Sequence, residues 1–334
     1  MIYIDGSEKS GSGTIVRYAI ALSSLLGEEI HIGNIRAKRD KPGLRPQHLA
    51  SVTACARMCE ARVEGAQVDS REIIYRPGAR INGGYYQLEI GTAGSTTLLA
   101  MTLLPLALFA DEETTLRISG GLFQDFAPSA HHMQHVLFPT LGKMGIKAGL
   151  EVIRAGYVPT GGGVIEVKLK PIGSSIRPLV MLQQGKVEEV TGLALSSRLK
   201  EQKVSQRMAE ECQKVLAEKG YRARIEALWD ETALQAGASL AVWAKTDAGC
   251  LLGSDRAGKR GRSSESIGRY VAQNLLEDLQ TGATVDRYLA DQLIIYAALA
   301  GGTTEYLIPR RSDHIDCQSL AGREIRSDNT NQGQ

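Results

Sequence analysis

The chain has 334 residues, of which 43% are hydrophobic, and its formal net charge at pH 7 is only +2. Because 39 basic side chains nearly balance 37 acidic ones, the composition argues against binding of nucleic acid by diffuse charge, so any recognition of phosphate should be local. The length and apolar content are sufficient for one large core and a second, smaller one.

The N-terminal part of the chain alternates strand and helix patterns. The order is strand, glycine-rich turn, helix, strand, basic loop and helix. Two further strands follow, and they are predicted to pair around the turn Asn82-Gly83-Gly84. The predicted elements are, in order, residues 2–4, 15–26, 30–32, 46–59, 73–75 and 85–90.

The same order of elements then repeats. Equivalent elements lie roughly 85 residues apart, which predicts an internal repeat of a two-helix, multi-strand unit. The elements of the second copy are predicted at residues 96–110, 114–119, 132–144, 150–154 and 164–170.

The pattern changes near Lys186. Alternating strands and one helix follow, and they end near a basic run at residues 256–262, which predicts a small inserted α/β domain. A third unit then begins, and it breaks off before the polar residues 327–334. The elements of the third unit are predicted at residues 267–279, 288–300 and 304–308.

These patterns together predict an α/β fold of the α+β kind. Three repeated βαβα-ββ units, the third incomplete, form a large domain of residues 1–185 and 276–334. Residues 186–275 form the small α/β domain, which is inserted into the third unit.

The loop that precedes the second helix concentrates positive charge. Charge focused in this way is suited to binding phosphates through charge-assisted hydrogen bonds, although a solvated basic loop is the simpler alternative on composition alone. The five cationic side chains of this ten-residue stretch are Arg36, Lys38, Arg39, Lys41 and Arg45.

The cysteines and the apolar runs predict the compartment. The five cysteines include no CxxC pair, which is typical of reduced thiols. The N-terminus lacks the form of a signal peptide, and the longest apolar run, residues 96–110, is too short to cross a bilayer. We therefore expect a soluble cytoplasmic protein without a membrane partner.

His131 and His135 lie four positions apart on a predicted helix, which is a spacing that metal ligands can have. No carboxylate or cysteine lies nearby in the sequence, so structural histidines are the better interpretation.

Several motifs occur along the chain in a fixed order. They are Ile4-Asp5-Gly6-Ser7, residues 35–48, Gly91-Thr92-Ala93-Gly94-Ser95, Ala127-Pro128 and Tyr288-Leu289-Ala290-Asp291-Gln292. Together they resemble the motifs of the RNA 3′-terminal phosphate cyclase family, and the resemblance covers most of the chain. It implies the repeated fold with an inserted domain, and a homodimer is one assembly known among related cyclases.

The resemblance also implies a ligase-type enzyme that uses ATP. A histidine would attack the α-phosphorus of ATP and release pyrophosphate, and His314 matches this nucleophile. A neutral imidazole nitrogen is a competent nucleophile near neutral pH. The AMP would pass to the RNA 3′-phosphate, and the neighbouring 2′-hydroxyl would expel it to form a 2′,3′-cyclic phosphate.

The family pattern further implies which residues bind ATP and the RNA end. The adenine would lie between Tyr288 and Pro128. Mg²⁺ or Mn²⁺ would accompany the phosphates, with Glu8 as the candidate protein ligand. The other residues that match ATP- and phosphate-binding positions are Arg17, Arg36, Arg39, Gln47, Asp291 and Gln292.

The chain departs from the family pattern at several places. Ser10 stands where the family has a glutamate that helps to bind the metal, and Ala100 stands where a glutamine is expected. The residues that follow His314 also differ, because a polar tail replaces the expected helix. Loss of a metal ligand commonly lowers the rate of such a reaction strongly.

Two alternatives therefore stand beside the active cyclase. The departures favour a non-catalytic relative that binds RNA or assists ribosome assembly, whereas His314 and the pair Arg36 and Arg39 favour the enzyme. A small-molecule transferase resembling the enolpyruvyl transferases is a weaker alternative, against which Tyr288 and Asp291 argue.

Overall fold

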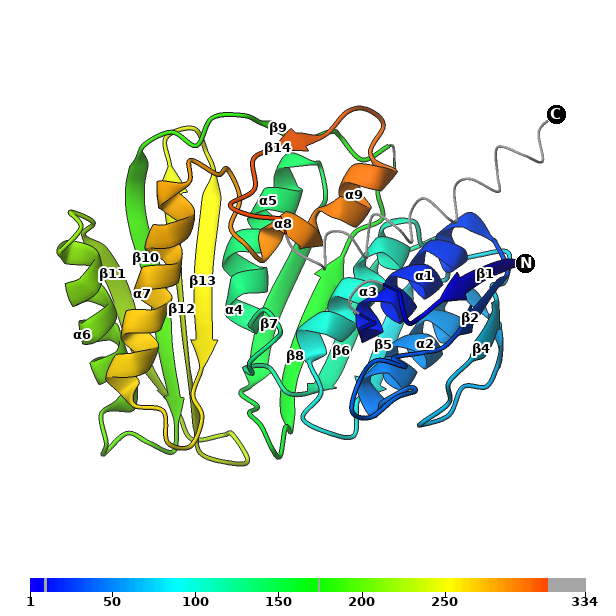
Figure 1. The fold of residues 1–334 in the computed structure, drawn as a ribbon, viewed down its shortest axis with the longest axis horizontal. Coiled ribbons are helices and arrows are strands. Elements are labelled where there is room, and N and C mark those ends of the chain that lie inside the picture. The colour runs from blue at the N-terminus through cyan, green and yellow to red at the C-terminus, as the bar shows by residue number, and fades with distance from the viewer. Residues whose placement is uncertain (9–10, 174, 312–334) are drawn as a thin grey trace.

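The fold has three blocks that follow one another along the long axis of the molecule (Figure 1). The structure, a computed structural model, describes residues 1–8, 11–173 and 175–311. A single hydrophobic cluster extends through all three blocks. Among the helices of these residues, none is both long enough and apolar enough to cross a membrane.

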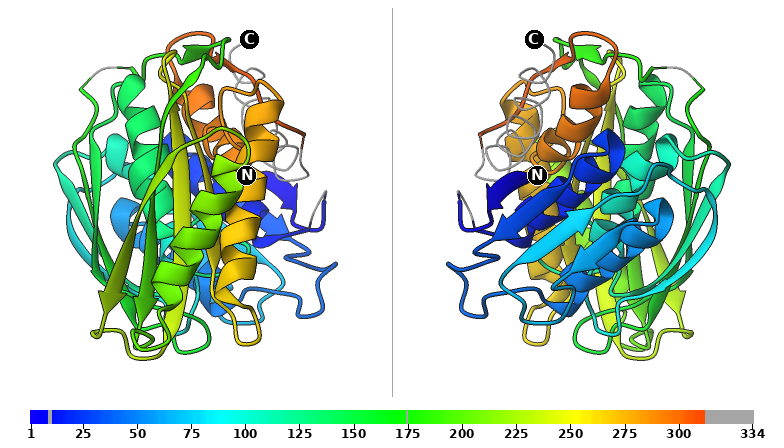
Figure 2. Two further views of the ribbon diagram at one scale, coloured as in Figure 1. Left: turned by 90° about the vertical axis from the view of Figure 1, so that its left-hand side faces the viewer. Right: turned by 90° about the vertical axis from the view of Figure 1, so that its right-hand side faces the viewer.

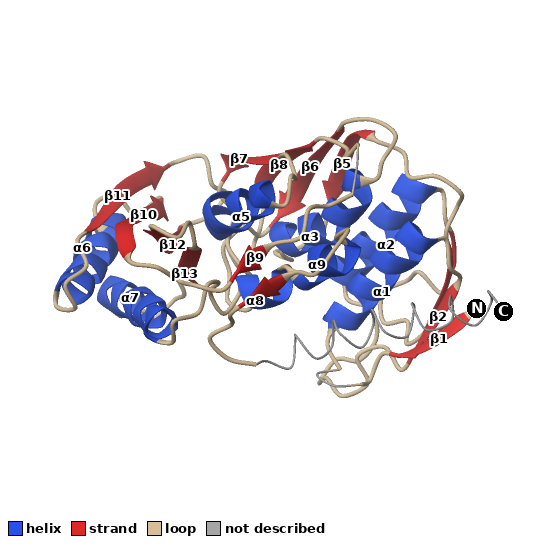
Figure 3. Cartoon of the chain, turned by 90° about the horizontal axis from the view of Figure 1, so that it is seen from above, coloured by secondary structure: helices blue, strands red, loops and turns tan. Residues whose placement is uncertain are grey.

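The first block is a four-stranded sheet in the order β1-β2-β4-β3. β1 and β2 are parallel, and the other pairs are antiparallel. Helices α1 and α2 lie between this sheet and the second block (Figure 3). The elements are β1 Ile2–Asp5, α1 Gly13–Leu26, β2 Ile30–Gly33, α2 Pro46–Cys59, β3 Arg62–Glu64 and β4 Ile73–Arg76.

The second block has the same strand order and directions. Its sheet runs β5-β6-β8-β7, with β5 and β6 parallel and the other pairs antiparallel, as a repeated unit would produce. Helix α3 contacts both α1 and α2 and so joins the first two blocks. The elements are β5 Gly84–Glu89, α3 Thr96–Leu108, β6 Thr114–Gly120, α4 Ala130–His132, a π-helical turn Met133–Leu137, α5 Phe138–Lys143, β7 Ala148–Arg154 and β8 Gly163–Leu169.

The predicted pairing of residues 73–75 with 85–90 is wrong. β4 pairs with β2 and β3, whereas β5 pairs with β6 of the next sheet. The reason lies in the connection between them, which is bonded to the second block. Gly83 N donates to Asp111 Oδ1 at 2.7 Å, and Gly84 N donates to the Glu113 carbonyl at 2.9 Å, so the chain is directed into a new sheet.

The third block is the small α/β sheet, in the order β11-β10-β12-β13. Helices α6 and α7 cover one of its faces (Figure 2). α7 packs against α6 and β13, so residues 267–279, whose pattern was assigned to a third repeated unit, belong to this layer. The elements are β10 Val187–Ser197, α6 Val204–Ala217, β11 Ala223–Asp230, β12 Gly237–Thr246, β13 Leu251–Ala257 and α7 Ser264–Gln280.

The chain then returns to the second block. Two short helices, α8 Leu289–Gln292 and α9 Ile294–Leu299, replace the single helix predicted at residues 288–300. β9 Val180–Met181 and β14 Glu305–Tyr306 pair in parallel. The predicted break in the third unit lies outside the described residues, so the three-unit repeat stays a prediction.

Candidate functional site

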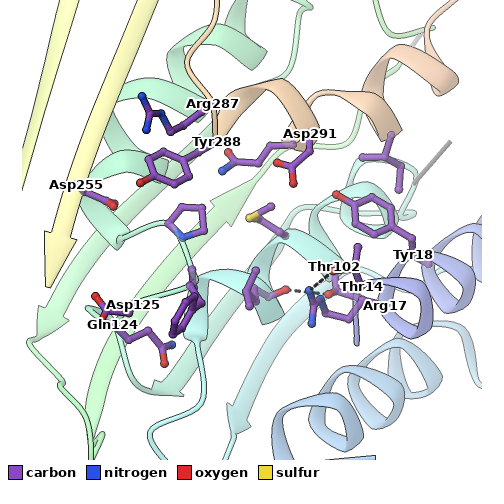
Figure 4. A pocket seen from close by; sticks show the side chains of 18 of the residues that line it. Thr14, Arg17, Tyr18, Thr102, Gln124, Asp125, Asp255, Arg287, Tyr288 and Asp291 are labelled. Carbon is purple, nitrogen blue, oxygen red and sulfur yellow. Dashed lines mark hydrogen bonds between the residues drawn. The ribbon is translucent and has the colours of Figure 1, made fainter. Parts of the chain in front are cut away.

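A pocket of about 310 Å³ lies where α1, α3, residues 124–128, β13 and α8 meet (Figure 4). Tyr288 and Asp291 approach it from the start of α8, and Arg17 approaches it from α1. Of the residues that the sequence singled out, the five that line the pocket are Arg17, Pro128, Tyr288, Asp291 and Gln292. The fold thus brings together residues from three distant segments.

One side of the pocket is built on the cap of α8. Asp286 is fully buried, and its Oδ1 accepts hydrogen bonds from the backbone N–H groups of Tyr288 and Leu289, both at 2.8 Å. Its Oδ2 accepts from Gly253 N at 2.7 Å. Burial opposes ionisation of this carboxyl, but the neighbouring His132 charge and these hydrogen bonds outweigh it and lower the pKa of Asp286. The turn that carries Tyr288 is therefore fixed to β13.

The opposite side is the loop of residues 124–128. The Pro128 carbonyl accepts a hydrogen bond from Thr97 Oγ1 at 2.8 Å. The next residue, Ser129, donates its N–H to Asp255 Oδ2 at 2.6 Å. Since both partners are buried residues of α3 and β13, Pro128 has little freedom to move.

The surroundings of the Asp291 carboxyl bring its pKa close to neutral pH. Burial raises its pKa to about 7, and the charge of Asp286 acts in the same direction, while Arg17 partly offsets them. Arg17 in turn donates from Nη2 to Thr14 Oγ1 at 3.3 Å. Arg17 and Asp291 therefore bring to this part of the pocket a cation and a carboxyl that can accept or donate a hydrogen bond.

The side-chain amide of Gln292, in the lining of the pocket, is buried without a hydrogen-bond partner among the described residues. Its side chain is 2% exposed, and within the described part of the chain neither amide atom has a hydrogen-bond partner. A buried unpaired amide is costly, so such a group is expected to have a partner in the working protein. A ligand with an adjacent donor and acceptor, such as the edge of a purine, fits this requirement.

The basic loop lies beside the pocket and does not line it. Arg36 Nη1 donates to the carbonyls of Lys41 and Gly43, at 2.7 and 2.9 Å, so this guanidinium holds its own loop together. Gln47 Oε1 accepts from Ser95 N at 3.4 Å. Arg39 is exposed. The structure therefore does not place these side chains in the pocket with Tyr288.

His48 connects the loop with Arg17. Its side chain is buried, and burial together with the positive charges of Arg17, Arg36 and Arg45 lowers its pKa to about 3. It is neutral at physiological pH and therefore adds no charge next to these arginines. Of the three arginines, Arg17 lines the pocket, whereas Arg45 is paired with Asp69.

Glu8, the candidate metal ligand, is held by hydrogen bonds of its backbone. Glu8 N donates to the Asp5 carbonyl at 3.2 Å, and the Glu8 carbonyl accepts from Gly11 N at 2.8 Å. No group of three His, Cys, Asp or Glu side chains able to hold an ion occurs within residues 1–8, 11–173 and 175–311. Ser10 and His314 lie outside the described residues.

The sequence missed several residues that shape the pocket. Asp286 carries a weak sequence signal, because an aspartate just before a helix is a common N-cap. The other missed residues come from strands and loops that no motif marks. Only one of them, Arg256, lies in a noted sequence feature, the basic run 256–262. These residues are Gln124, Asp125, Phe126, Asp255 and Arg256, all of which line the pocket.

Comparisons with known proteins agree on one family. The family model described as RNA 3′-terminal phosphate cyclase matches residues 8–321. A protein of that name from Pyrococcus abyssi is 40% identical over 316 residues, which are 94% of this chain and 90% of the relative. Proteins of the same name from Korarchaeum cryptofilum and Pyrobaculum neutrophilum are 37% and 36% identical, again over 94% of this chain and over 89% and 90% of their own lengths.

Proposed function

Because the chain belongs to the RNA 3′-terminal phosphate cyclase family, we propose that it converts the 3′-terminal phosphate of an RNA into a 2′,3′-cyclic phosphate with consumption of ATP. The observation that carries this proposal is the convergence of Arg17, Pro128, Tyr288, Asp291 and Gln292 on one pocket. These residues match the family's nucleotide-binding positions, and they come from segments that only the fold brings together.

The pocket suits an adenine nucleotide. An adenine between Tyr288 and Pro128 would bury two apolar faces, and the unpaired Gln292 amide would gain a partner on the edge of the base. Arg17 would contact the phosphates from within the pocket, and Arg36 and Arg39 of the adjacent loop are proposed for the phosphates that extend out of it, because guanidinium groups can grip two phosphate oxygens at once. The shared pocket of Arg17, Pro128, Tyr288, Asp291 and Gln292 supports this proposal.

The proposed reaction has three transfers at phosphorus. A ring nitrogen of His314 bonds to the α-phosphorus of ATP, and the bond to pyrophosphate breaks. An oxygen of the RNA 3′-phosphate then attacks the same phosphorus, and the bond to His314 breaks. Finally the 2′-hydroxyl attacks the 3′-phosphorus and loses its proton, AMP leaves, and the cyclic phosphate remains. Catalysis of such transfers depends mainly on positioning and on cations around the phosphates.

We propose Mg²⁺ or Mn²⁺ as the accompanying metal. A magnesium ion bound with a nucleotide commonly takes most of its ligands from phosphates and water and only one or two from carboxylates. Glu8 is the candidate carboxylate, and the described residues offer no complete protein cage for an ion. Under this proposal most ligands of the metal come from the phosphates and water, and the protein supplies at most Glu8.

A second candidate function is RNA binding without catalysis. Ala100, where the family has a glutamine, is fully buried in α3 and brings no polar group to the site. Ser10 replaces the family's metal-binding glutamate. These two positions favour a relative that keeps the fold and has lost the reaction.

One experiment separates the two functions. The protein is incubated with ATP labelled in the α-phosphate and with Mg²⁺ or Mn²⁺, and acid-labile label on the protein is measured. The cyclase predicts label on the wild type and none on His314→Ala, and transfer of the AMP when a 3′-phosphorylated RNA is added. Equal absence of label on both proteins, with RNA binding retained, would establish the non-catalytic function.

A further inference from the structure

Phe126 has an exposure that the fold does not explain. The relative exposure of its side chain is 103%, and it stands at the rim of the pocket. Its φ angle is +69°, a left-handed conformation that bulky residues rarely adopt. A fully exposed phenyl ring in an unfavourable backbone conformation gains nothing from folding, so its orientation points to a ligand.

The loop that carries Phe126 is clamped from one side by arginines of the small block. Asp125 receives two parallel hydrogen bonds from Arg262, at 3.0 and 2.9 Å, and its Oδ1 lies 3.3 Å from Arg256 Nε. Arg262 also donates to the Ala257 carbonyl at 2.6 Å. Because Pro128 is fixed on the other side, the backbone that carries Phe126 is held in place before any ligand arrives. Stacking on such a ring costs little conformational entropy.

A basic turn adjoins this clamp. Lys259 and Arg260 are both exposed, and they lie in the connection between β13 and α7. The turn is closed by a hydrogen bond from Arg262 N to the Lys259 carbonyl at 2.9 Å, so the residue that clamps Asp125 belongs to it. The Asp125 charge is neutralised by Arg262 first and Arg256 next, which lowers the pKa of its carboxyl. An approaching phosphate would therefore meet a net positive surface.

We propose that Phe126 and the Lys259-Arg260 turn bind the RNA substrate beside the pocket. The Phe126 ring stacks on the 3′-terminal nucleobase, and the two cations contact phosphates further upstream. Aromatic stacking and phosphate contacts are the usual means of binding single-stranded RNA without sequence preference. This inference rests on the proposed cyclase function, in which the pocket between Tyr288 and Pro128 is already assigned to ATP.

The first test compares the effect of the Phe126 ring on the use of RNA with its effect on the use of ATP. Phe126→Asn removes the ring with a residue that tolerates positive φ, and Phe126→Tyr keeps a ring. We expect Phe126→Asn to lower kcat/KM for a 3′-phosphorylated RNA about 5- to 100-fold, with Phe126→Tyr close to the wild type. Labelling of the protein by ATP should fall by a much smaller factor, because Phe126 contributes only to the rim of the pocket. Tyr85→Ala, which removes an exposed ring on β5, is the matched control.

The RNA itself provides the second half of this test. An RNA whose 3′-terminal nucleoside lacks its base should react as slowly with the wild type as normal RNA does with Phe126→Asn. The substitution should then have no further effect on the abasic RNA. If the abasic RNA stays sensitive to Phe126→Asn, or if ATP labelling falls by the same factor as RNA use, the ring does not stack on the terminal base and the proposal is wrong.

A binding measurement keeps this proposal distinct from the proposed function. RNA with 2-aminopurine at its 3′ end reports stacking by fluorescence quenching and needs no ATP. A wild type that quenches the probe without being labelled by ATP would contradict catalysis and support the RNA site. A wild type that is labelled by ATP and quenches no more than Phe126→Asn would contradict the RNA site alone.

The basic turn has its own prediction. The double variant Lys259→Ala, Arg260→Ala should weaken RNA binding uniformly across sequences and reduce the slope of log affinity against log salt by about 1.4. Lys219→Ala, Arg222→Ala is the matched control, because these exposed cations lie just before β11, at the opposite edge of the same sheet. Equal salt slopes in the two double variants would show that the turn does not contact phosphates.

Discussion

His132 and Asp286 form a buried ion pair that joins the two sides of the pocket. His132 Nε2 lies 3.0 Å from Asp286 Oδ2, and both side chains are almost completely shielded from solvent. Asp286 caps the turn that carries Tyr288, while the His132 N–H donates to Ser129 Oγ, next to Pro128, at 3.1 Å. Burial alone would lower the pKa of His132, but the Asp286 charge raises it. The pair therefore helps to set the distance between the two walls proposed for the adenine.

Asp286→Asn tests this connection. The substitution leaves a buried histidine without its counter-charge, and the loss of one partner of a buried pair typically costs about 3–5 kcal/mol. We expect a large fall in the free energy of unfolding, measured in urea, and a raised KM for ATP in the protein that remains folded. Asp247→Asn, at an exposed carboxylate that accepts from Lys186 N, is the control and should change both quantities little.

Asp291 should make stability depend on pH. Its pKa is raised to about 7 in the folded protein and is near 3.8 in the unfolded chain. The folded state therefore holds the extra proton between these values, so the stabilisation is complete below pH 4 and is lost as the pH rises to 7. The difference in unfolding free energy between the wild type and Asp291→Asn should shift in favour of the variant by on the order of a few kcal/mol from pH 4 to pH 8. A constant difference would contradict the raised pKa.

Gln292→Met should raise the stability of the ligand-free protein and lower its affinity for ATP. The thioether has a similar length and brings no unpaired amide into the interior, so we expect the ligand-free protein to gain about 1–2 kcal/mol in unfolding free energy. ATP affinity should fall, because the proposed partner of the base edge is removed. Thermal unfolding with and without ATP measures both effects, and a variant that loses stability without ATP would show that Gln292 is already satisfied by the protein.

We predict unequal roles for two cations of the basic loop, Arg39 and Lys41. We expect Arg39→Ala to weaken ATP use far more than Lys41→Ala, because a planar guanidinium can bind two phosphate oxygens together. Steady-state labelling by ATP across a range of ATP concentrations measures the difference. Equal effects would mean that the loop acts only as diffuse charge.

Gly13 explains how α1 delivers Arg17. A β-carbon at this position would lie 2.0 Å from His48 Nε2, so only glycine lets the first turn of α1 approach the second helix this closely. Gly13→Ala should cost about 1–3 kcal/mol of stability and lower ATP use by displacing Arg17. Gly142→Ala is the control, because nothing lies within 4 Å of its β-carbon position and the helix should gain about 0.5–1 kcal/mol.

The sequence indicated most of the secondary structure because it depends on local periodicity. Apolar spacing predicted α1, α2 and the strands of the first two sheets except the short β3, and the structure confirms those that were predicted. It did not predict that β4 and β5 belong to different sheets, because strand pairing is decided by hydrogen bonds to residues distant in sequence. The Asn82-Gly83-Gly84 segment has the composition of a hairpin turn, yet the amides of Gly83 and Gly84 bond to the second block.

The candidate site divides in the same way. The resemblance of the sequence motifs to those of the cyclase family was enough to single out Arg17, Pro128, Tyr288 and their neighbours. Which of these residues share a pocket, and that Asp286 and His132 hold the pocket's walls, was decided only by the tertiary structure. The same is true of the exposed ring of Phe126 and its clamp. Burial and contacts between distant segments arise when the blocks pack together, and no local pattern encodes them.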